Sequence, residues 1–442
     1  MNIAIVGAGW AGLSAAVEAV ALGADVTLFE ATRTPGGRAR ALPAQRPDGV
    51  PLLLDNGQHI LIGAYRETLA LMQRLGVDPQ AVLLGTPLSL PYPDGSGLQT
   101  PRWAARWPAP LDAVAAILTA RGWRWSERLA LVRASLGWQR SGFACDPRMT
   151  VGELCAVLPA RVMDELIEPL CVSALNLPAA AASGQVFLTV MRDALFGQGF
   201  GAWSASALLL PREDLGTLLP EAACRHLGER VRRGTRVTAL QRTPSGWTLS
   251  GDGWSDSFDR VIWATAASPA VSVMGAATGV NATGAALRDW AATTKRLDFT
   301  AITTVYAFAP GARLNAPMVA LRCSLQAPAQ FVFDRGLLRP HDASAQGLLA
   351  FVISASEGER DALQAQVLAQ AASQLGLRDL QPIQTVVEKR ATFACTPGLL
   401  RPPMAIAPGL WAAGDYIDGP YPATLEGAVR SGLAAARLAC AA

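Results

Sequence analysis

The chain has 442 residues, too many for one typical domain, and its net charge of +3 excludes the strongly basic surface of a nucleic-acid-binding protein. Hydrophobic residues make up 51% of it, yet no run reaches the roughly twenty apolar residues of a transmembrane helix. This composition predicts an apolar ligand, contact with a membrane surface, or an alanine-rich core. The cysteines form no CxxC pair and the N-terminus enters a strand without a signal peptide, which predicts a cytoplasmic protein.

The first thirty residues predict a strand, a helix and a second strand. The apolar run Asn2–Val6 leads into the glycine-rich segment 7–12, and a helical stretch follows over 13–22. A second strand over 25–29 ends at the acidic Glu30. A GxGxxG segment in this context is the fingerprint of a dinucleotide-binding βαβ unit.

Each residue of this fingerprint has its own physical role. Gly7 permits the tight turn, Gly9 lets the backbone approach a pyrophosphate, and Gly12 allows the helix to pack closely on the strand. The helix N-terminus offers unpaired N–H groups and a positive dipole end to the phosphates. Glu30 is placed to accept hydrogen bonds from a ribose.

A second glycine motif favours FAD over NAD. Gly36 and Gly37 let the chain pass close to the dinucleotide, and Arg38 adds a guanidinium fork for phosphate. This arrangement resembles the glutathione-reductase-type FAD fold, in the branch shared by amine oxidases and carotenoid desaturases. The predicted cofactor is therefore FAD.

The middle of the chain has no flavin motif until about residue 230. Residues 103–140 are mostly helical and interleave arginines with five tryptophans, at positions 103, 107, 123, 125 and 138. This stretch fits either a peripheral membrane-docking surface or an internally packed helical lid. Residues 150–200 also read as helical, with an interruption at Pro169. Strands are expected within 231–237, 246–250, 259–263, 302–306 and 348–353, and a helix around 357–375.

The last fifty residues return to flavin-type motifs. An apolar strand ends in Gly414-Asp415, which places Asp415 to bond the ribityl chain or a hydroxyl on the phosphate side. A helix is expected over 424–435, and its first amides, at Thr424 and Leu425, are expected to face the pyrimidine end of a flavin.

Two segments in the middle support the same cofactor. In the superfamily that this fold resembles, such a strand brings a backbone amide beside the adenine. Val237, on an expected strand over 234–237, is either that residue or an ordinary strand valine. Residues 261–265 resemble the superfamily's "ATG" motif, although Ala266 replaces its glycine.

The order of these motifs predicts a discontinuous architecture. Residues 1–75, 215–270 and 390–442 form the FAD-binding domain, and residues 76–214 and 271–389 form the substrate-binding or lid domain. The expected fold class is α/β: a glutathione-reductase-type FAD-binding Rossmann domain with an interleaved α+β substrate domain.

Two signatures narrow the resemblance. Residues 55–65, which begin Asp-Asn-Gly-Gln-His, and residues 421–429 resemble the paired signatures of plant-type phytoene and ζ-carotene desaturases. The form of the first signature, together with Gly-Asp-Tyr-Ile-Asp-Gly-Pro at 414–420, most resembles the squalene-associated FAD-dependent desaturases. That family is also known as hydroxysqualene dehydroxylases, from bacterial hopanoid pathways.

The resemblance implies reductive removal of the hydroxyl of hydroxysqualene, with hydride from reduced FAD N5 reaching an allylic carbon to give squalene. Such a step needs a general acid. The resemblance places His59 and Gly57 near the isoalloxazine, so His59 is either that acid or a structural histidine that pins its loop. Asp55 and Tyr421 are further catalytic candidates, and Tyr65 and Asp418 are other polar residues of the same motifs.

Three alternatives remain open on the sequence. An amine oxidase of the same fold often uses a lysine near N5, and this chain has only Lys295 and Lys389. A phytoene-type desaturase would transfer hydride in the oxidative direction. A non-catalytic prenyl carrier would resemble the Rab GDP-dissociation inhibitors, which share the fold.

The expected partners follow from the solubility of the substrate. They are a long apolar isoprenoid, the upstream prenyl synthases of the squalene pathway, and the inner face of the cytoplasmic membrane, where the protein would bind peripherally. No second dinucleotide fingerprint is present to identify the electron donor.

Overall fold

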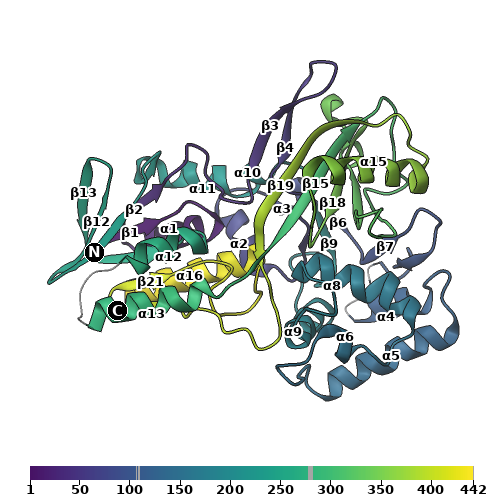
Figure 1. Cartoon of the computed structure of the whole chain (residues 1–442), viewed down its shortest axis with the longest axis horizontal. Helices are drawn as coiled ribbons and strands as arrows, with labels where there is room; N and C mark the ends of the chain where they lie inside the picture. Colours follow the sequence, from purple (N-terminus) through teal and green to yellow (C-terminus); the bar gives the residue numbers. More distant parts are fainter. Residues whose placement is uncertain (106, 108–109, 277–281, 442) are drawn as a thin grey trace.

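The computed structural model describes residues 1–105, 107, 110–276 and 282–441. Its largest sheet has the strand order β10-β2-β1-β14-β21-β20, and every neighbouring pair is parallel except β20 and β21. The six strands come from three separate parts of the chain: β1 (Asn2–Val6), β2 (Asp25–Glu30), β10 (Val231–Arg233), β14 (Arg260–Trp263), β20 (Ala405–Ala407) and β21 (Leu410–Ala412). They lie together on one side of the molecule in Figure 1.

The central position of β1 determines where a ligand can bind. From β1 the sheet extends to β2 on one side and to β14 on the other, so the strand order reverses at β1. In open α/β sheets, ligands bind at the carboxyl edge beside such a switch point. The glycine-rich loop 7–12 follows β1 at this edge.

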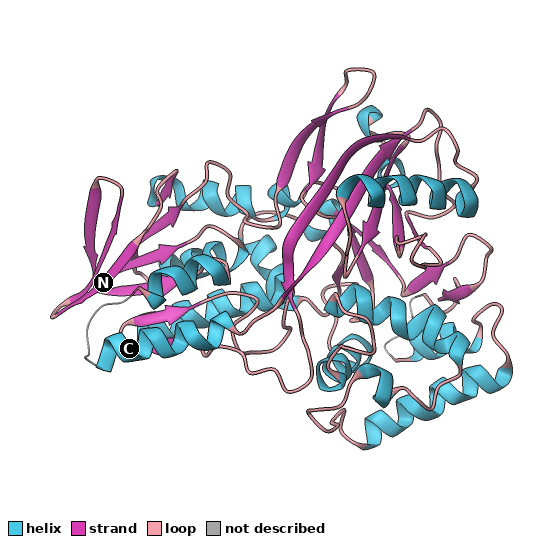
Figure 2. Ribbon diagram, in the orientation of Figure 1, coloured by secondary structure: helices cyan, strands magenta, loops and turns pink. Residues whose placement is uncertain are grey.

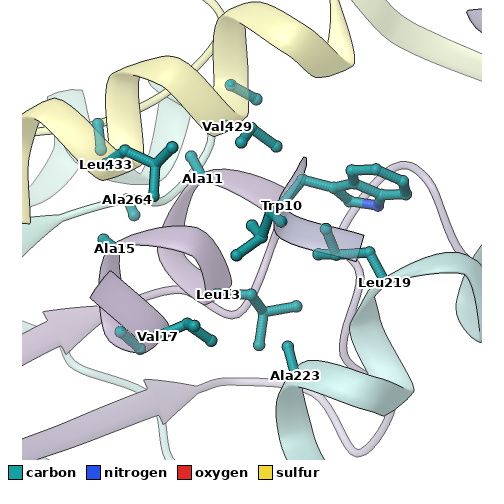
Figure 3. Close-up of a cluster of buried hydrophobic side chains, with 14 of the residues drawn as sticks. Trp10, Ala11, Leu13, Ala15, Val17, Leu219, Ala223, Ala264, Val429 and Leu433 are labelled. Atoms are coloured by element: carbon teal, nitrogen blue, oxygen red, sulfur yellow. The ribbon is translucent and has the colours of Figure 1, made fainter. Parts of the chain in front are cut away.

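Two helices cover one face of this sheet. α1 (Trp10–Ala21) crosses from β1 to β2 and packs against α16 (Leu425–Ala441), as Figure 3 shows for Ala11 and Val429. The helices approach so closely that a Cβ at Gly432 would lie 2.1 Å from the Ala11 carbonyl oxygen. Small residues at this crossing therefore let the two motif-bearing ends of the chain meet.

A second sheet is antiparallel, with the order β16-β17-β18-β15-β19. Its strands are β15 (Phe299–Phe308), β16 (Met318–Ala320), β17 (Phe331–Asp334), β18 (Leu348–Ile353) and β19 (Gln381–Phe393), and α15 (Arg360–Leu375) packs on it. The long β15 and β19 run through the middle of the molecule in Figure 2. Strand β18 is wholly buried, which explains its unbroken apolar sequence.

A helical region lies beside this second sheet (Figure 1). It contains α4 (Leu111–Leu118), α5 (Trp125–Arg140), α6 (Val151–Leu154), α7 (Ala160–Val162), α8 (Glu168–Leu175) and α9 (Gly184–Phe196). The helical run from α7 to α8 changes its hydrogen-bond pattern directly before Pro169, where a π-helical turn spans 163–167. Ile167 and Glu168 keep helical backbone angles, so the chain continues into α8, and the missing N–H of Pro169 is accommodated at this irregular turn.

Smaller elements connect these layers. The strands are β3 (Ala41–Gln45), β4 (Pro51–Asp55), β5 (Leu61–Ile62), β6 (Leu83–Thr86), β7 (Ser89–Pro91), β8 (Gly97–Gln99), β9 (Leu208–Pro211), β11 (Ala239–Thr243), β12 (Gly246–Gly251) and β13 (Trp254–Phe258). The helices are α2 (Arg66–Arg74), α3 (Pro79–Val82), α10 (Leu215–Leu218), α11 (Pro220–Leu227), α12 (Ala267–Gly275), α13 (Ala282–Lys295) and α14 (Arg335–Leu338).

The expected strand over 234–237 is wrong. Strand β10 ends at Arg233 because Gly234 turns the chain with a φ of +66°, and Val237 follows in an irregular segment. Val237 is buried in an apolar cluster with Phe29 and Trp247. Its predicted contact with adenine stays a prediction.

No helix in the described part of the chain is long and apolar enough to cross a membrane. The mixed α/β fold with a largely parallel sheet confirms the predicted fold class. The exact domain boundaries stay a prediction.

Candidate flavin and substrate site

The glycine-rich loop is shaped by close contacts at two of its glycines and by open space at the third. Gly7 has a φ of +106°, and a Cβ there would lie 2.7 Å from the Ala264 carbonyl oxygen at the end of β14. A Cβ at Gly12 would lie 1.8 Å from the Gly7 carbonyl oxygen. A Cβ at Gly9 would meet no atom within 4 Å. The loop is therefore closed toward the sheet and open at Gly9, where α1 begins without a side-chain cap.

Glu30 ties the end of β2 to this loop. One carboxylate oxygen accepts a hydrogen bond from the Ala8 amide at 2.7 Å, and the other accepts from the Thr32 amide and hydroxyl. The side chain is 9% exposed. These bonds fix the carboxylate beside the glycine-rich loop, where its predicted ribose contact would form.

The Gly36-Gly37 segment also passes against the loop. The Gly36 amide donates to the Ala8 carbonyl at 2.8 Å, and a Cβ at Gly37 would lie 3.3 Å from the Gly9 Cα. Gly36 and Gly37 have φ values of +109° and +63°, which L side chains rarely adopt. The two glycine motifs therefore lie side by side.

Arg38 and Asp415, predicted from opposite ends of the chain, form a partly buried ion pair. The Arg38 Nη2 and the Asp415 Oδ1 are 2.5 Å apart, and Arg38 Nη1 donates to the Ala391 carbonyl oxygen. Burial alone lowers the pKa of Arg38, but the neighbouring Asp415 carboxylate outweighs it, so the pKa is raised. Arg38 thus holds a fixed positive charge between the second glycine motif and the Gly414-Asp415 turn.

The chain before α16 has a strained backbone. Tyr421 and Ala423 have φ values of +58° and +59°, although neither is glycine. The Thr424 hydroxyl accepts a hydrogen bond from the Gly427 amide and caps the helix, which begins at Leu425. Left-handed conformations at two non-glycine residues in three positions are typical of a functional turn.

A second cluster of polar residues contains Asp55 and His59. Asp55 is 1% exposed at the end of β4, and its Oδ1 accepts from the Leu215 amide at 2.8 Å. The His59 Nδ1 lies 2.7 Å from the Gly57 carbonyl oxygen. Because a carbonyl oxygen can only accept, Nδ1 carries the proton and Nε2 of the neutral ring has a free lone pair.

The pKa shifts of this pair move both groups toward their neutral forms. Burial raises the pKa of Asp55, and the nearby Arg335 only partly opposes it. Burial also lowers the pKa of His59, against the opposing effects of the Gly57 bond and the Asp55 charge. A neutral imidazole with Nδ1 protonated accepts a proton at Nε2 rather than donating one.

Arg335 is a buried residue of this group that the sequence analysis did not identify. It is 2% exposed, and its Nη1 donates to Gln58 Oε1 at 3.0 Å and lies 3.7 Å from Asp55 Oδ2. Asp55 Oδ2 and Arg335 Nη2 are buried without a hydrogen-bond partner among the described residues. The sequence signal that could have identified Arg335 is its position directly after the apolar strand β17. Such a position predicts a buried charge, and buried charges are rare unless they are paired or functional.

Tyr421 belongs to a different cluster from His59. Its ring meets Tyr65 edge-to-face at 6.0 Å, and the Arg430 guanidinium lies 4.8 Å from its centre. Burial and the neighbouring Asp193 raise the pKa of Tyr421, so the phenol stays protonated. Asp418 is exposed and pairs with Arg401 at 3.1 Å. No hydrogen bond or ion pair between described residues joins Tyr421 to His59, so their common role stays a prediction.

These residues fit a flavin dinucleotide. The open side of Gly9 and the uncapped start of α1 suit a pyrophosphate, and Glu30 and Asp415 suit hydroxyl groups of the two sugar-derived chains. The fold and this set of donors define a flavin-dependent oxidoreductase.

Comparison with known proteins agrees with this class. The chain belongs to the flavin containing amine oxidoreductase family, whose sequence profile matches residues 10–440. A protein named hydroxysqualene dehydroxylase from Rhodopseudomonas palustris is 27% identical over 100% of this chain and 99% of its own length. Another of that name, from Sinorhizobium fredii, is 28% identical over 99% of this chain and 98% of its own.

Solved structures support the fold alone. The cyclohexylamine oxidase from Brevibacterium oxydans superposes with a TM-score of 0.66 at 17% identity, over 99% of this chain and 98% of that one. The predicted family resemblance, the FAD cofactor and the assignment as a flavin-dependent oxidoreductase are confirmed.

Proposed function

We propose that this protein is a reductive dehydroxylase that converts hydroxysqualene to squalene. The observation that carries the proposal is its end-to-end similarity to two proteins named for that activity. The net reaction replaces a carbon–oxygen bond by a carbon–hydrogen bond. It consumes one hydride and one proton and releases water.

Reduced FAD, when bound, supplies the hydride. The protein must keep water away from the allylic cation that forms when the hydroxyl leaves. Leu54 and Tyr306, which flank Asp55, belong to a buried apolar cluster that extends into the helical region. This surrounding favours a long apolar isoprenoid with one polar group and supports exclusion of water at Asp55 and His59.

The Asp55 and His59 side chains are the proposed proton source. The neutral His59 ring would only accept a hydrogen bond from the substrate hydroxyl at Nε2. To release the hydroxyl as water, His59 would first take up a proton at Nε2 from solvent or from neutral Asp55, and the imidazolium would then donate that proton to the leaving oxygen. Asp55, whose pKa is raised, retains a proton to higher pH than an exposed carboxyl and can share it with His59. Activity should therefore increase as pH falls from 8 toward the lowered pKa of His59.

Both lysines argue against an amine-oxidase mechanism. Lys389 on β19 and Lys295 at the end of α13 are exposed, so neither supplies the buried lysine that the alternative requires. The remaining enzymatic alternative is a phytoene-type desaturase, which would transfer hydride from the substrate to oxidised flavin. Its product would be a more unsaturated isoprenoid instead of squalene.

An anaerobic single turnover tests the proposal. We expect photoreduced enzyme to reoxidise its flavin and form squalene when hydroxysqualene in detergent is added. A flavin that stays reduced, with no squalene formed, would refute the function. His59→Gln should slow the turnover by about 100-fold and flatten its pH dependence. His226→Gln, at an exposed site, is the matched control.

The cofactor site has an independent test in its glycines. Gly9→Ala adds a Cβ into open space, so the protein should fold but purify with little flavin, whereas Gly12→Ala meets backbone at 1.8 Å and should fail to fold. A Gly9→Ala protein with full flavin content would argue against the proposed position of the pyrophosphate.

The proposed partners are those of an apolar substrate. Upstream prenyl synthases of the squalene pathway would provide hydroxysqualene, and the enzyme would meet it at the inner surface of the cytoplasmic membrane as a peripheral protein.

A further inference from the structure

The helix α4 is oriented with its large side chains toward solvent. Its inward positions are Asp112, Ala113, Ala115 and Ala116, all buried. Its outward positions are Leu111, Val114 and Leu118, which are 52%, 36% and 37% exposed. An ordinary surface helix has the opposite arrangement, with its large apolar side chains in the core.

The neighbouring α5 also exposes large apolar side chains, although it buries large ones on its inner face. Its inner face buries Leu131 and Trp138, while Trp125, Leu129 and Leu136 are exposed on the outside. Trp125 is 65% exposed, the highest value for any tryptophan among the large exposed hydrophobic side chains. The two helices lie side by side at one end of the molecule, in the lower right of Figure 1.

Arg128 joins the outward sides of the two helices, and a pair of exposed tryptophans precedes α4 in the chain. Arg128 of α5 donates to the Leu118 and Ala120 carbonyl oxygens at the end of α4, and its guanidinium lies 4.8 Å from the Trp125 ring. Before α4, Trp103 and Trp107 are 60% and 43% exposed, and their rings contact each other at 4.9 Å. We call the outward side chains of Trp103, Trp107, α4 and α5 the tryptophan face.

The charges around the tryptophan face are almost all positive. Residues 101–140 contain seven arginines and two acids. Asp112 is 2% exposed and bonds Ser206, and Glu127 accepts from the Arg124 amide. Arg121, Arg124 and Arg133 are exposed. Exposed tryptophan and leucine with a surrounding set of arginines is the pattern of a surface that binds anionic lipid.

We propose that the tryptophan face docks on an anionic lipid bilayer. The aromatic and aliphatic side chains would enter the interfacial region, and the arginines would contact the headgroups. The inner sides of the same helices share one apolar cluster with Leu54 and Tyr306, which flank Asp55. Docking through this face therefore brings a bilayer to the helical region that packs against the candidate substrate site. The proposal does not depend on the identity of the substrate.

The test measures binding of the flavin-loaded protein to vesicles of phosphatidylglycerol and phosphatidylcholine, and to vesicles of phosphatidylcholine alone. We expect co-sedimentation with the anionic vesicles and quenching of tryptophan fluorescence by brominated phosphatidylglycerol. Trp103→Ser with Trp125→Ser should weaken binding by more than about tenfold, and Arg124→Gln with Arg133→Gln should weaken it by about tenfold at low salt.

The matched control is Leu22→Ser with Leu438→Ser. These side chains are 49% and 48% exposed. Leu22 directly follows α1 and Leu438 lies on α16, and both helices are at the other end of the molecule from α4 and α5 in Figure 1. We expect the control to bind like the unmodified protein, and all variants to keep the same flavin spectrum and melting temperature. Equal binding by the tryptophan variant and the control, or no binding of the unmodified protein to anionic vesicles, would overturn the proposal. Loss of a dimer in the tryptophan variant without vesicle binding would instead identify a contact between two copies.

Discussion

Two ion pairs near the candidate site differ in burial and in hydrogen bonding. Arg38 and Asp415 meet at 2.5 Å in a hydrogen bond, with side-chain exposures of 33% and 9%. Arg335 and Asp55 are more deeply buried, at 3% and 1%, yet their closest atoms are 3.7 Å apart and share no hydrogen bond. The more buried pair is therefore the less completely paired.

This difference separates two uses of the same residue types. A hydrogen-bonded carboxylate compensates the charge of its arginine and holds two segments together. A desolvated carboxyl with one unpaired oxygen is pushed toward its neutral form and can exchange a proton, and the raised pKa of Asp55 has this cause. Arg38 and Asp415 thus act as a clamp, whereas Arg335 and Asp55 leave a titratable group beside His59.

The largest effect should follow removal of the arginine from the looser pair. Arg335→Met leaves Asp55 without its nearest cation and should destabilise the protein by about 3 kcal/mol at pH 7.5. The loss should shrink as pH falls, because a protonated Asp55 needs no partner. Urea unfolding at pH 5 and 7.5 measures both values, with the exposed Arg313→Met as control. A loss that is equal at both pH values would contradict the titration of Asp55.

Breaking the clamp should have a smaller effect that does not depend on pH near neutrality. Asp415→Ala strands the positive charge of Arg38, which is one-third exposed and so partly solvated, and should cost about 2 kcal/mol. It should also lower the flavin content of the purified protein. Asp418→Ala, at an exposed position of the same loop, should change neither quantity. Full stability of Asp415→Ala would show that the pair is not a clamp.

Asp55→Asn removes the titration of Asp55 and so measures how that titration changes stability with pH. The raised pKa of Asp55 stabilises the folded state at low pH, and this contribution is lost as pH rises above the unfolded value of about 4. The free energy of unfolding of the variant, measured relative to the unmodified protein, should therefore increase between pH 5 and 8. A constant or decreasing difference would mean that Asp55 is ionised in the folded protein throughout this range.

The smallest effect is expected at Tyr306, which supports the backbone of Asp55. Its hydroxyl donates to the Asp55 carbonyl oxygen at 2.9 Å. Tyr306→Phe removes this bond in a buried site and should cost about 1 kcal/mol without changing the pH dependence. A changed pH profile would indicate that the hydroxyl acts on the Asp55 carboxyl rather than on its backbone.

Much of the cofactor region could be predicted from the sequence because its constraints are local. Gly7, Gly9 and Gly12 occur at fixed spacings after an apolar strand, and backbone geometry alone requires glycine at two of them. A motif predicts Asp55 and His59, and the structure places Asp55 in a buried position and His59 in a partly buried one in the same short segment. The contribution of Arg335 was not predicted, since it lies 277 positions from Gln58 in the chain and only the tertiary packing brings the two side chains together.

The sequence by itself determined the dinucleotide fold, the FAD cofactor and the family resemblance, since each depends on short motifs whose spacing sets a backbone shape. Only the tertiary structure decided which tryptophans face solvent, because Trp123 and Trp138 are buried while Trp103, Trp107 and Trp125 are exposed within the same stretch. It also decided that Arg38 meets Asp415 and that Arg335 approaches Asp55. Burial and pairing depend on which distant segments pack together, and no local pattern specifies that.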